Sequence, residues 1–164
     1  MAFSVFSENQ KISKNGGNSF LSQFTIRGVS MEPTLKDGEQ VYVDADYYKT
    51  HNLTRGDIIA FKFKMQEKPF VKRVIALSGD RVEFGKDGNI YINGEILDES
   101  YLSENYHFDP SKLKVLLIPL NQTSGTVPEG TVLVLGDNRK NSFDSEDYGF
   151  VPIEYILGKI ILSL

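Results

Sequence analysis

The chain has 164 residues, of which 40% are hydrophobic and 12% aromatic, so it can form one folded core and is too apolar for a disordered protein. Its formal net charge is −4 and it has no basic run, which argues against nucleic acid as a partner. The absence of cysteine excludes disulfides, a thiol nucleophile and a thiolate metal site.

The first part of the chain differs in composition from the rest. Residues 1–19 are rich in Ser, Asn, Lys and Gly, and we expect a flexible leader there, followed by one folded region over 20–164. No stretch of the sequence reaches the roughly 18 consecutive apolar residues that a membrane-spanning helix requires.

The folded region is predicted to be mainly β, because short β-branched and aromatic runs alternate with turn signals. Strands are expected at 24–26, 41–43, 58–63, 70–77, 82–84, 90–92, 132–135 and 159–164, with a short helical turn at 153–156. Residues 98–130 contain many turn-forming residues and are expected to be an irregular elaboration of the β core.

Ser30 and Lys72 are the most informative pair in the sequence. A serine hydroxyl needs a base to become a nucleophile, and a lysine amine can be that base when burial lowers its pKa. Lys72 lies in an apolar, β-rich run, where burial is expected. Taken alone, Ser30 also fits a turn serine and Lys72 a strand lysine whose ammonium reaches water.

Three ordered segments resemble the type I signal peptidases of bacteria, Ser/Lys proteases that remove signal peptides from exported proteins. Residues 30–35 match the family's nucleophile box, 72–80 its lysine box and 136–145 its third box. Three boxes in this order are highly specific, whereas one alone would be weak. The resemblance covers about residues 20–164 and implies a signal-peptidase/LexA-like β fold with a small β-rich elaboration between the second and third boxes.

The resemblance also implies a role for individual residues. Ser30 would be the nucleophile, Lys72 the general base, and Ser142 the hydroxyl that orients the lysine. Supporting roles would fall to Arg73, Asp137 and Asp144.

The sequence departs from the family pattern at three positions. Ala76 replaces a glycine of the lysine box, and Glu146 replaces the arginine that ends the third box. Gly28 stands where some members carry a hydroxyl that stabilises the oxyanion, so that donor is missing and the backbone or another group must take its place.

The expected substrates are signal peptides of exported preproteins, cut after small residues such as Ala-x-Ala. An extended peptide would add as a strand near Gly28 and Phe70, and Met31 is a candidate pocket wall. The expected partners are these peptides and a membrane surface, at the extracytoplasmic face of a bacterial membrane. No cofactor is implied.

The neighbourhood of Ser30 is also expected to be apolar. Because the family works against a bilayer, we expect some apolar residues beside the cleft to form an exposed patch; the alternative is that all are core residues. The candidates are Phe20, Leu21, Phe24, Ile26 and Phe70.

The acidic residues near the end of the third box are not expected to bind metal, because they lack the spacing and central glycine of a calcium loop. They are Asp137, Asp144, Glu146 and Asp147. His51 and His107 lie in polar, turn-like contexts typical of the surface, and neither stands at the position of Lys72, which argues against the Ser/His version of the family.

Two other functions share parts of this pattern. A LexA-type self-cleaving regulator uses the same Ser/Lys chemistry but needs a DNA-binding domain, for which residues 1–19 are too short and polar. A catalytically weak, signal-peptidase-like accessory protein of pilus or surface-fibre assembly would be expected to have lost dyad residues, and this chain keeps both.

Overall fold

The computed structural model describes residues 7–13, 20–103 and 113–162, with side chains from residue 21 onward. Its main feature is an eight-stranded sheet of order β1-β2-β3-β11-β4-β5-β9-β10, in which every neighbouring pair is antiparallel. The strands are β1 (Ser7–Ser13), β2 (Phe20–Thr25), β3 (Gln40–Asp44), β4 (Ile58–Phe61), β5 (Phe70–Ala76), β9 (Thr131–Leu135), β10 (Val151–Pro152) and β11 (Ile156–Ile161). The predicted mainly β fold is confirmed.

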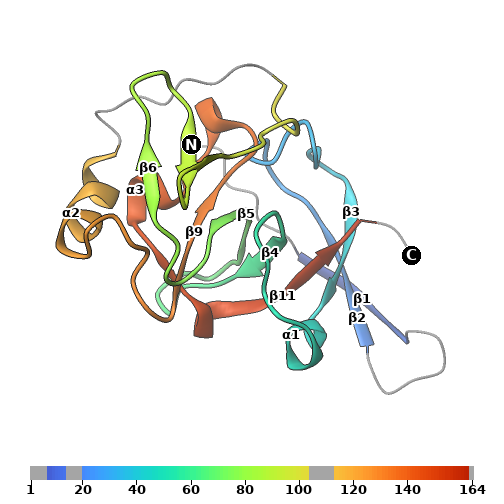
Figure 1. The fold of residues 1–164 in the computed structure, drawn as a ribbon. Helices are drawn as coiled ribbons and strands as arrows, with labels where there is room; N and C mark the ends of the chain where they lie inside the picture. The colour runs from blue at the N-terminus through green and yellow to red at the C-terminus, as the bar shows by residue number, and fades with distance from the viewer. Residues whose placement is uncertain (1–6, 14–19, 104–112, 163–164) are drawn as a thin grey trace.

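A smaller unit is inserted between β5 and β9. Strands β6 (Val82–Phe84), β7 (Ile90–Ile92) and β8 (Glu95–Ile96) form a separate three-stranded sheet, and helix α2 (Lys114–Gln122) follows. Figure 1 shows this unit on one side of the molecule and the β1–β2 pair on the other. The remaining helical segments are short: α1 (Tyr47–Thr50), η1 (Arg139–Asn141), α3 (Ser145–Tyr148) and η2 (Ile153–Tyr155).

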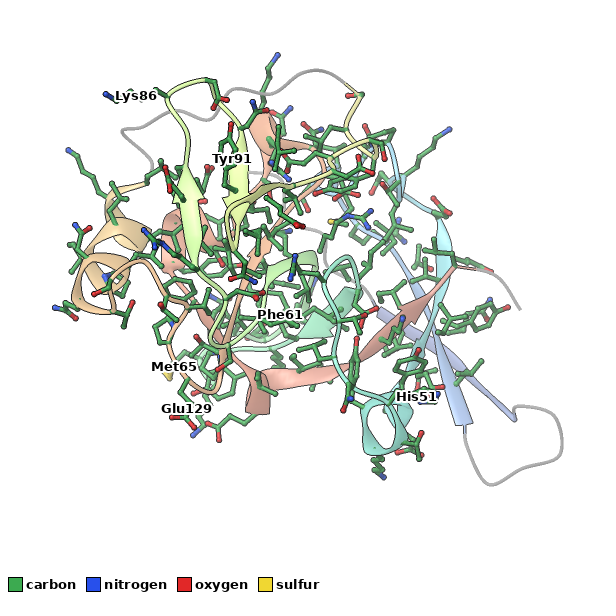
Figure 2. All side chains as sticks on the ribbon, viewed as in Figure 1. His51, Phe61, Met65, Lys86, Tyr91 and Glu129 are labelled. Carbon is green, nitrogen blue, oxygen red and sulfur yellow. The ribbon has the colours of Figure 1, made fainter. Side chains whose placement is uncertain are left out.

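Strands β4, β5 and β9 form the buried centre of the large sheet. All four residues of β4 are buried, as are all residues of β5 except Arg73 and all residues of β9 except Thr131. Continuous burial explains why β4 and β9 read as apolar runs rather than alternating ones, and why β5 is apolar on both sides of Lys72 and Arg73. Phe61 lies near the middle of the ribbon in Figure 2, among packed side chains.

The pairing of these strands sets the position of the lysine strand. Lys72 lies opposite Ile59 of β4, and the next residue, Arg73, lies opposite Leu135 at the end of β9. The chain leaves β9 at Leu135 and enters the third box directly, so this register carries Gly136 and Asp137 to the lysine strand.

Two predictions about secondary structure were wrong. Residues 7–13, placed in a flexible leader by their polar composition, form strand β1, which pairs with β2 from Ser7↔Thr25 to Ser13↔Phe20. The interval 98–130, predicted to be irregular, contains helix α2, which buries Leu116 and Leu120 against the smaller unit. Backbone pairing and tertiary packing overrode the local composition in both places. Residues 1–6, 14–19 and 104–112 lie outside the described residues.

The apolar patch predicted beside Ser30 stays a prediction, and three of its five candidate residues do not contribute to it. Leu21, Ile26 and Phe70 are core residues with at most 3% exposure, and Phe24 is partly buried against the same core. The side chain of Phe20 lies outside the described part of the structure. Burying the apolar surface of the three core residues stabilises the fold.

Candidate active site

Ser30 lies in a tight turn that follows β2. Gly28 has φ of +96°, a conformation that a side chain disfavours, and its N–H donates to Asp37 Oδ1 at 2.7 Å. The predicted turn at Gly28 is therefore present. The same backbone conformation gives a physical reason why this position carries no hydroxyl side chain.

Lys72 reaches across from β5 to the serine. Its Nζ lies 2.7 Å from Ser30 Oγ and 3.0 Å from the Val71 carbonyl oxygen. Both Ser30 and Lys72 have 0% exposure. The two residues are 42 positions apart in the sequence, so the sheet, rather than local geometry, brings them together.

The environment of Lys72 suits a base. Burial lowers the pKa of its amine from 10.5 to about 8, an effect opposed by the negative charges of Asp144, Asp137 and Asp147. Among the described residues, the groups within hydrogen-bond distance of Nζ are a hydroxyl and a carbonyl, and no carboxylate there holds the ammonium form. A substantial fraction of Lys72 is therefore neutral near pH 8 and able to accept a proton.

Arg73 and Asp137 join the lysine strand to the third box. Arg73 donates from Nε to Asp137 Oδ1 at 2.9 Å and from Nη2 to Oδ2 at 2.6 Å, a two-point ion pair. Thr34 also donates to Asp137 Oδ2, at 2.5 Å, so the nucleophile box shares the same carboxylate. The pairing implied by the resemblance is present, and it connects all three boxes.

Asp144 organises the end of the third box. Its carboxylate accepts from Gly136 N at 2.9 Å and from Glu146 N at 3.2 Å, and it caps helix α3 together with Asp147. Backbone donors thus satisfy Asp144 although Glu146 replaces the family arginine.

Ser142 is brought to the site but is not bonded to Lys72. Its Oγ is buried and has no hydrogen-bond partner in the structure. A Cβ added at Gly136 would collide with Ser142 Oγ and with the Ser30 carbonyl oxygen, so only glycine allows the third box to pack this closely on the nucleophile turn. The orienting role of Ser142 stays a prediction.

Met31 and Phe70, expected to contact substrate, are both buried. Met31 has 0% exposure and packs in the core cluster beneath the nucleophile turn, and Phe70 stacks on Phe61 with ring centroids 5.7 Å apart. Their substrate contacts also stay predictions.

The one histidine in the described part of the chain, His51, makes no contact with the dyad. His51 is exposed and stacks on Tyr47, and Figure 2 shows it beside α1 at the edge of the molecule. His107 lies outside the described residues. Within the described residues, no group of His, Asp and Glu side chains is arranged to hold a metal ion.

Sequence reasoning missed three residues of this neighbourhood: Arg139, Glu99 and Tyr101. Arg139 is 4% exposed and donates from Nε to the Gly136 carbonyl at 3.0 Å and from Nη2 to Glu99 at 2.5 Å. The position of Arg139 inside the third box could have indicated that it lies near the site. Glu99 and Tyr101 gave no signal, because they belong to an interval without a motif.

Comparisons with known proteins agree with this geometry. Residues 17–164 match the family described as signal peptidase, peptidase S26. Signal peptidase IB of Staphylococcus aureus is 39% identical over 150 residues, covering 88% of this chain and 78% of that protein. A probable signal peptidase I-2 of Synechocystis is 38% identical over 142 residues, covering 82% of this chain and 58% of that protein.

A solved structure supports the same assignment. The crystal structure of a signal peptidase I from Enterococcus faecalis V583 matches with a TM-score of 0.51 and 34% sequence identity, covering 66% of this chain and 97% of that one. The fold and its relatives thus define the chain as an enzyme of a serine peptidase class. It belongs to the signal peptidase family, peptidase S26, with signal peptidase I as its activity.

Proposed function

We propose that this enzyme removes N-terminal signal peptides after small residues, with Ser30 as nucleophile and Lys72 as general base. The observation that carries the proposal is the 2.7 Å separation of Lys72 Nζ and Ser30 Oγ in a fully buried pair. Burial removes the competing water and lowers the pKa of the amine, which is what a serine nucleophile needs from its partner.

The reaction would proceed by acyl transfer. Neutral Lys72 takes the Ser30 proton as Oγ attacks the scissile carbonyl carbon, and the resulting ammonium then protonates the leaving amine as the C–N bond breaks. The acyl group stays on Ser30 as an ester. Lys72 next removes a proton from water as the water oxygen attacks the ester. The Lys72 ammonium then returns a proton to Ser30 Oγ as the ester C–O bond breaks, and the signal peptide leaves with a new carboxyl terminus. The backbone N–H of Ser30 is the proposed first donor to the oxyanion.

The supporting residues would hold this pair in register. The two-point bond between Arg73 and Asp137 fixes the residue next to the base, and Asp144 fixes Gly136 beside the nucleophile. Ser142 would orient the Lys72 amine once substrate is bound, because catalytic hydrogen bonds often tighten only in the substrate complex. Its buried, unpartnered hydroxyl supports that role.

Substrate would bind as an added strand near Gly28 and Phe70. Main-chain bonding of this kind gives affinity, and pockets for alternate side chains give specificity. Met31, directly after the nucleophile, would contribute to a pocket wall, and the preference for small residues follows from the family.

The substrates and their location are also proposals. Preproteins carrying signal peptides meet the enzyme at a membrane, so we place the catalytic site at the extracytoplasmic face of a bacterial membrane, in contact with its surface. None of the helices in the described part of the chain has the length and apolar character that crossing a bilayer requires.

Incubation with a synthetic signal-peptide substrate, followed by mass spectrometry, tests the proposal. We expect one cut after an Ala-x-Ala sequence, loss of that cut when the alanine before it is replaced by phenylalanine, and no product with Ser30→Ala. Cleavage that persists in Ser30→Ala, or an intact peptide with the unaltered chain, would contradict the proposal.

A further inference from the structure

Tyr101 belongs to the short segment that leads out of the smaller unit, yet it lies between two arginines of the catalytic boxes. Arg73 stacks over its ring, with the guanidinium carbon 4.0 Å from the ring centroid. Arg139 donates from Nη2 to its hydroxyl at 3.3 Å, and that hydroxyl lies 3.3 Å from Glu99 Oε1. A single side chain therefore contacts the lysine box and the third box.

Each arginine is one step from a member of the dyad. Arg73 directly follows Lys72 and is bonded to Asp137 and to the Gly56 carbonyl. Arg139 holds the Gly136 carbonyl, and Gly136 packs against the Ser30 carbonyl. Two residues further on, Asn138 N donates to the same Ser30 carbonyl at 3.0 Å. Tyr101 thus connects the backbone beside the base to the backbone beside the nucleophile.

The buried charge of Arg139 needs the hydrogen-bond and ion-pair partners that surround Tyr101. Arg139 is 4% exposed, and a buried guanidinium is costly unless it is paired and hydrogen-bonded. Glu99 supplies the charge, and Tyr101 supplies a hydroxyl and one wall of the site. Burial raises the pKa of Tyr101 above its ordinary value, so the hydroxyl stays protonated throughout the working range.

We propose that Tyr101 is a positioning residue for the Ser30–Lys72 dyad, acting through Arg73 and Arg139. This proposal rests on the proposed function of Ser30 and Lys72 as the catalytic dyad. With the ring removed, Arg73 loses its stacking surface and Arg139 one hydrogen-bond partner, so both boxes can shift and the Nζ–Oγ distance lengthens. Because proton transfer depends steeply on that distance, turnover should suffer more than substrate binding.

Three tyrosine variants separate this role from simple stability. Tyr101→Phe keeps the stacked ring and loses only the hydroxyl. Tyr101→Leu loses both without changing any charge. Tyr91→Leu is the matched control. Tyr91, labelled in Figure 2, also donates to a carboxylate, Asp87 at 2.7 Å, but both residues belong to the β6–β7 hairpin rather than to a catalytic box.

Steady-state kinetics well below the melting temperature give the first readout. We expect Tyr101→Leu to lower kcat at least tenfold with KM within about twofold, Tyr101→Phe to keep kcat within about threefold, and Tyr91→Leu to match the unaltered enzyme. An unchanged kcat in Tyr101→Leu, or an equal loss in Tyr91→Leu, would overturn the proposal.

A second readout needs no substrate. The chain has no cysteine, so Ser30→Cys introduces a single thiol beside Lys72, whose titration can be followed by thiolate absorbance. We expect the neighbouring ammonium to lower the pKa of the thiol, and Tyr101→Leu added to Ser30→Cys to raise it toward its ordinary value. A thiol pKa unaffected by Tyr101→Leu would overturn the positioning role. If the thiol responds but no signal peptide is cut by the unaltered chain, the proposed substrate fails and the positioning role stands.

Discussion

Two lysines of the large sheet lie on the strands that flank β4, and their surroundings differ. Ile59 of β4 pairs with Lys72 on β5 and with Lys159 on β11. Lys72 is fully buried beside a hydroxyl and a carbonyl, and burial lowers the pKa of its amine to about 8. Lys159 is partly exposed and bonded to Asp57 at 2.7 Å; burial alone would lower the pKa of its amine, but the Asp57 bond raises it. Partner atoms and solvent access, rather than the strand or the residue type, therefore make Lys72 suited to act as a base and Lys159 a member of an ion pair.

The largest expected effect is on turnover, which should depend on Lys72 and not on Lys159. Lys72→Met and Ser30→Ala should each reduce turnover of a signal-peptide substrate by about 10³-fold or more, because neither residue can perform the other's step. Lys159→Met should keep turnover within about threefold. Activity assays with circular dichroism as a folding check would measure this, and near-normal turnover in Lys72→Met would refute the assigned base.

Ser142→Ala should have the next largest effect. Losing one positioning hydrogen bond commonly costs about 1–3 kcal/mol, which corresponds to roughly 5- to 150-fold in rate. We expect kcat to fall with little change in KM, both measured from rates over a range of substrate concentrations up to saturation. Thr123→Val is a suitable control, because it also removes a hydroxyl, one that bonds to backbone carbonyls at the end of α2 rather than in a catalytic box. Unchanged kcat in Ser142→Ala would make Ser142 an ordinary loop serine.

The rate should depend on pH through Lys72. Only the neutral amine accepts the Ser30 proton, so the rate rises with pH; for a pKa of about 8, the neutral fraction grows about tenfold between pH 7 and pH 9. Lys159 should not contribute to this profile. A rate of the chemical step that stays flat between about pH 6 and 9, a range that brackets the pKa of about 8, would contradict the proposed base.

The smallest expected effects are on the free energy of unfolding, which the two lysine variants should change in opposite directions. The folded pKa of Lys72 lies below its unfolded value of 10.5, so burying it costs about 3 kcal/mol below pH 8, and this cost disappears as pH rises toward 10.5. Lys72→Met should therefore stabilise the fold near pH 7 by about 1–3 kcal/mol, partly offset by the lost bond to Ser30.

Lys159→Met should do the reverse. The raised pKa of Lys159 means that its pairing stabilises the fold below its unfolded pKa and is lost as pH rises through the folded value. The variant leaves Asp57 buried without its cation, and we expect a loss of about 1–2 kcal/mol in urea unfolding at pH 7. Equal shifts of the same sign in both variants would show that the two lysines have similar environments.

Sequence patterns were most informative where residues act through local motifs. Strands β4 and β9 were predictable from their continuous apolar runs, and the apolar residues around Lys72 correctly indicated its burial. Strand β1 and helix α2 were not predictable, because they form by pairing with β2 and by packing against the smaller unit, which their own composition does not mark. Tyr101 gave no signal for the same reason: its contacts are long-range, and nothing in its own segment marks them.

The apolar residues around the nucleophile turn illustrate another limit. Apolar character is compatible with a core as well as with the exposed patch that we predicted, and only the sheet arrangement decides that Leu21 and Ile26 are buried. The composition of a strand does not specify which face is covered until its neighbours are known.

The most direct test of the account is the titration of the lysine side chains themselves. In the unaltered chain labelled at lysine, NMR can follow each Cε resonance with pH, and Lys72→Met and Lys159→Met assign the two signals of interest. The account predicts that Lys72 titrates near pH 8 and Lys159 above 10.5. A Lys72 signal that titrates at or above 10 would contradict it, because the amine would then carry its proton throughout the range in which it must act as a base.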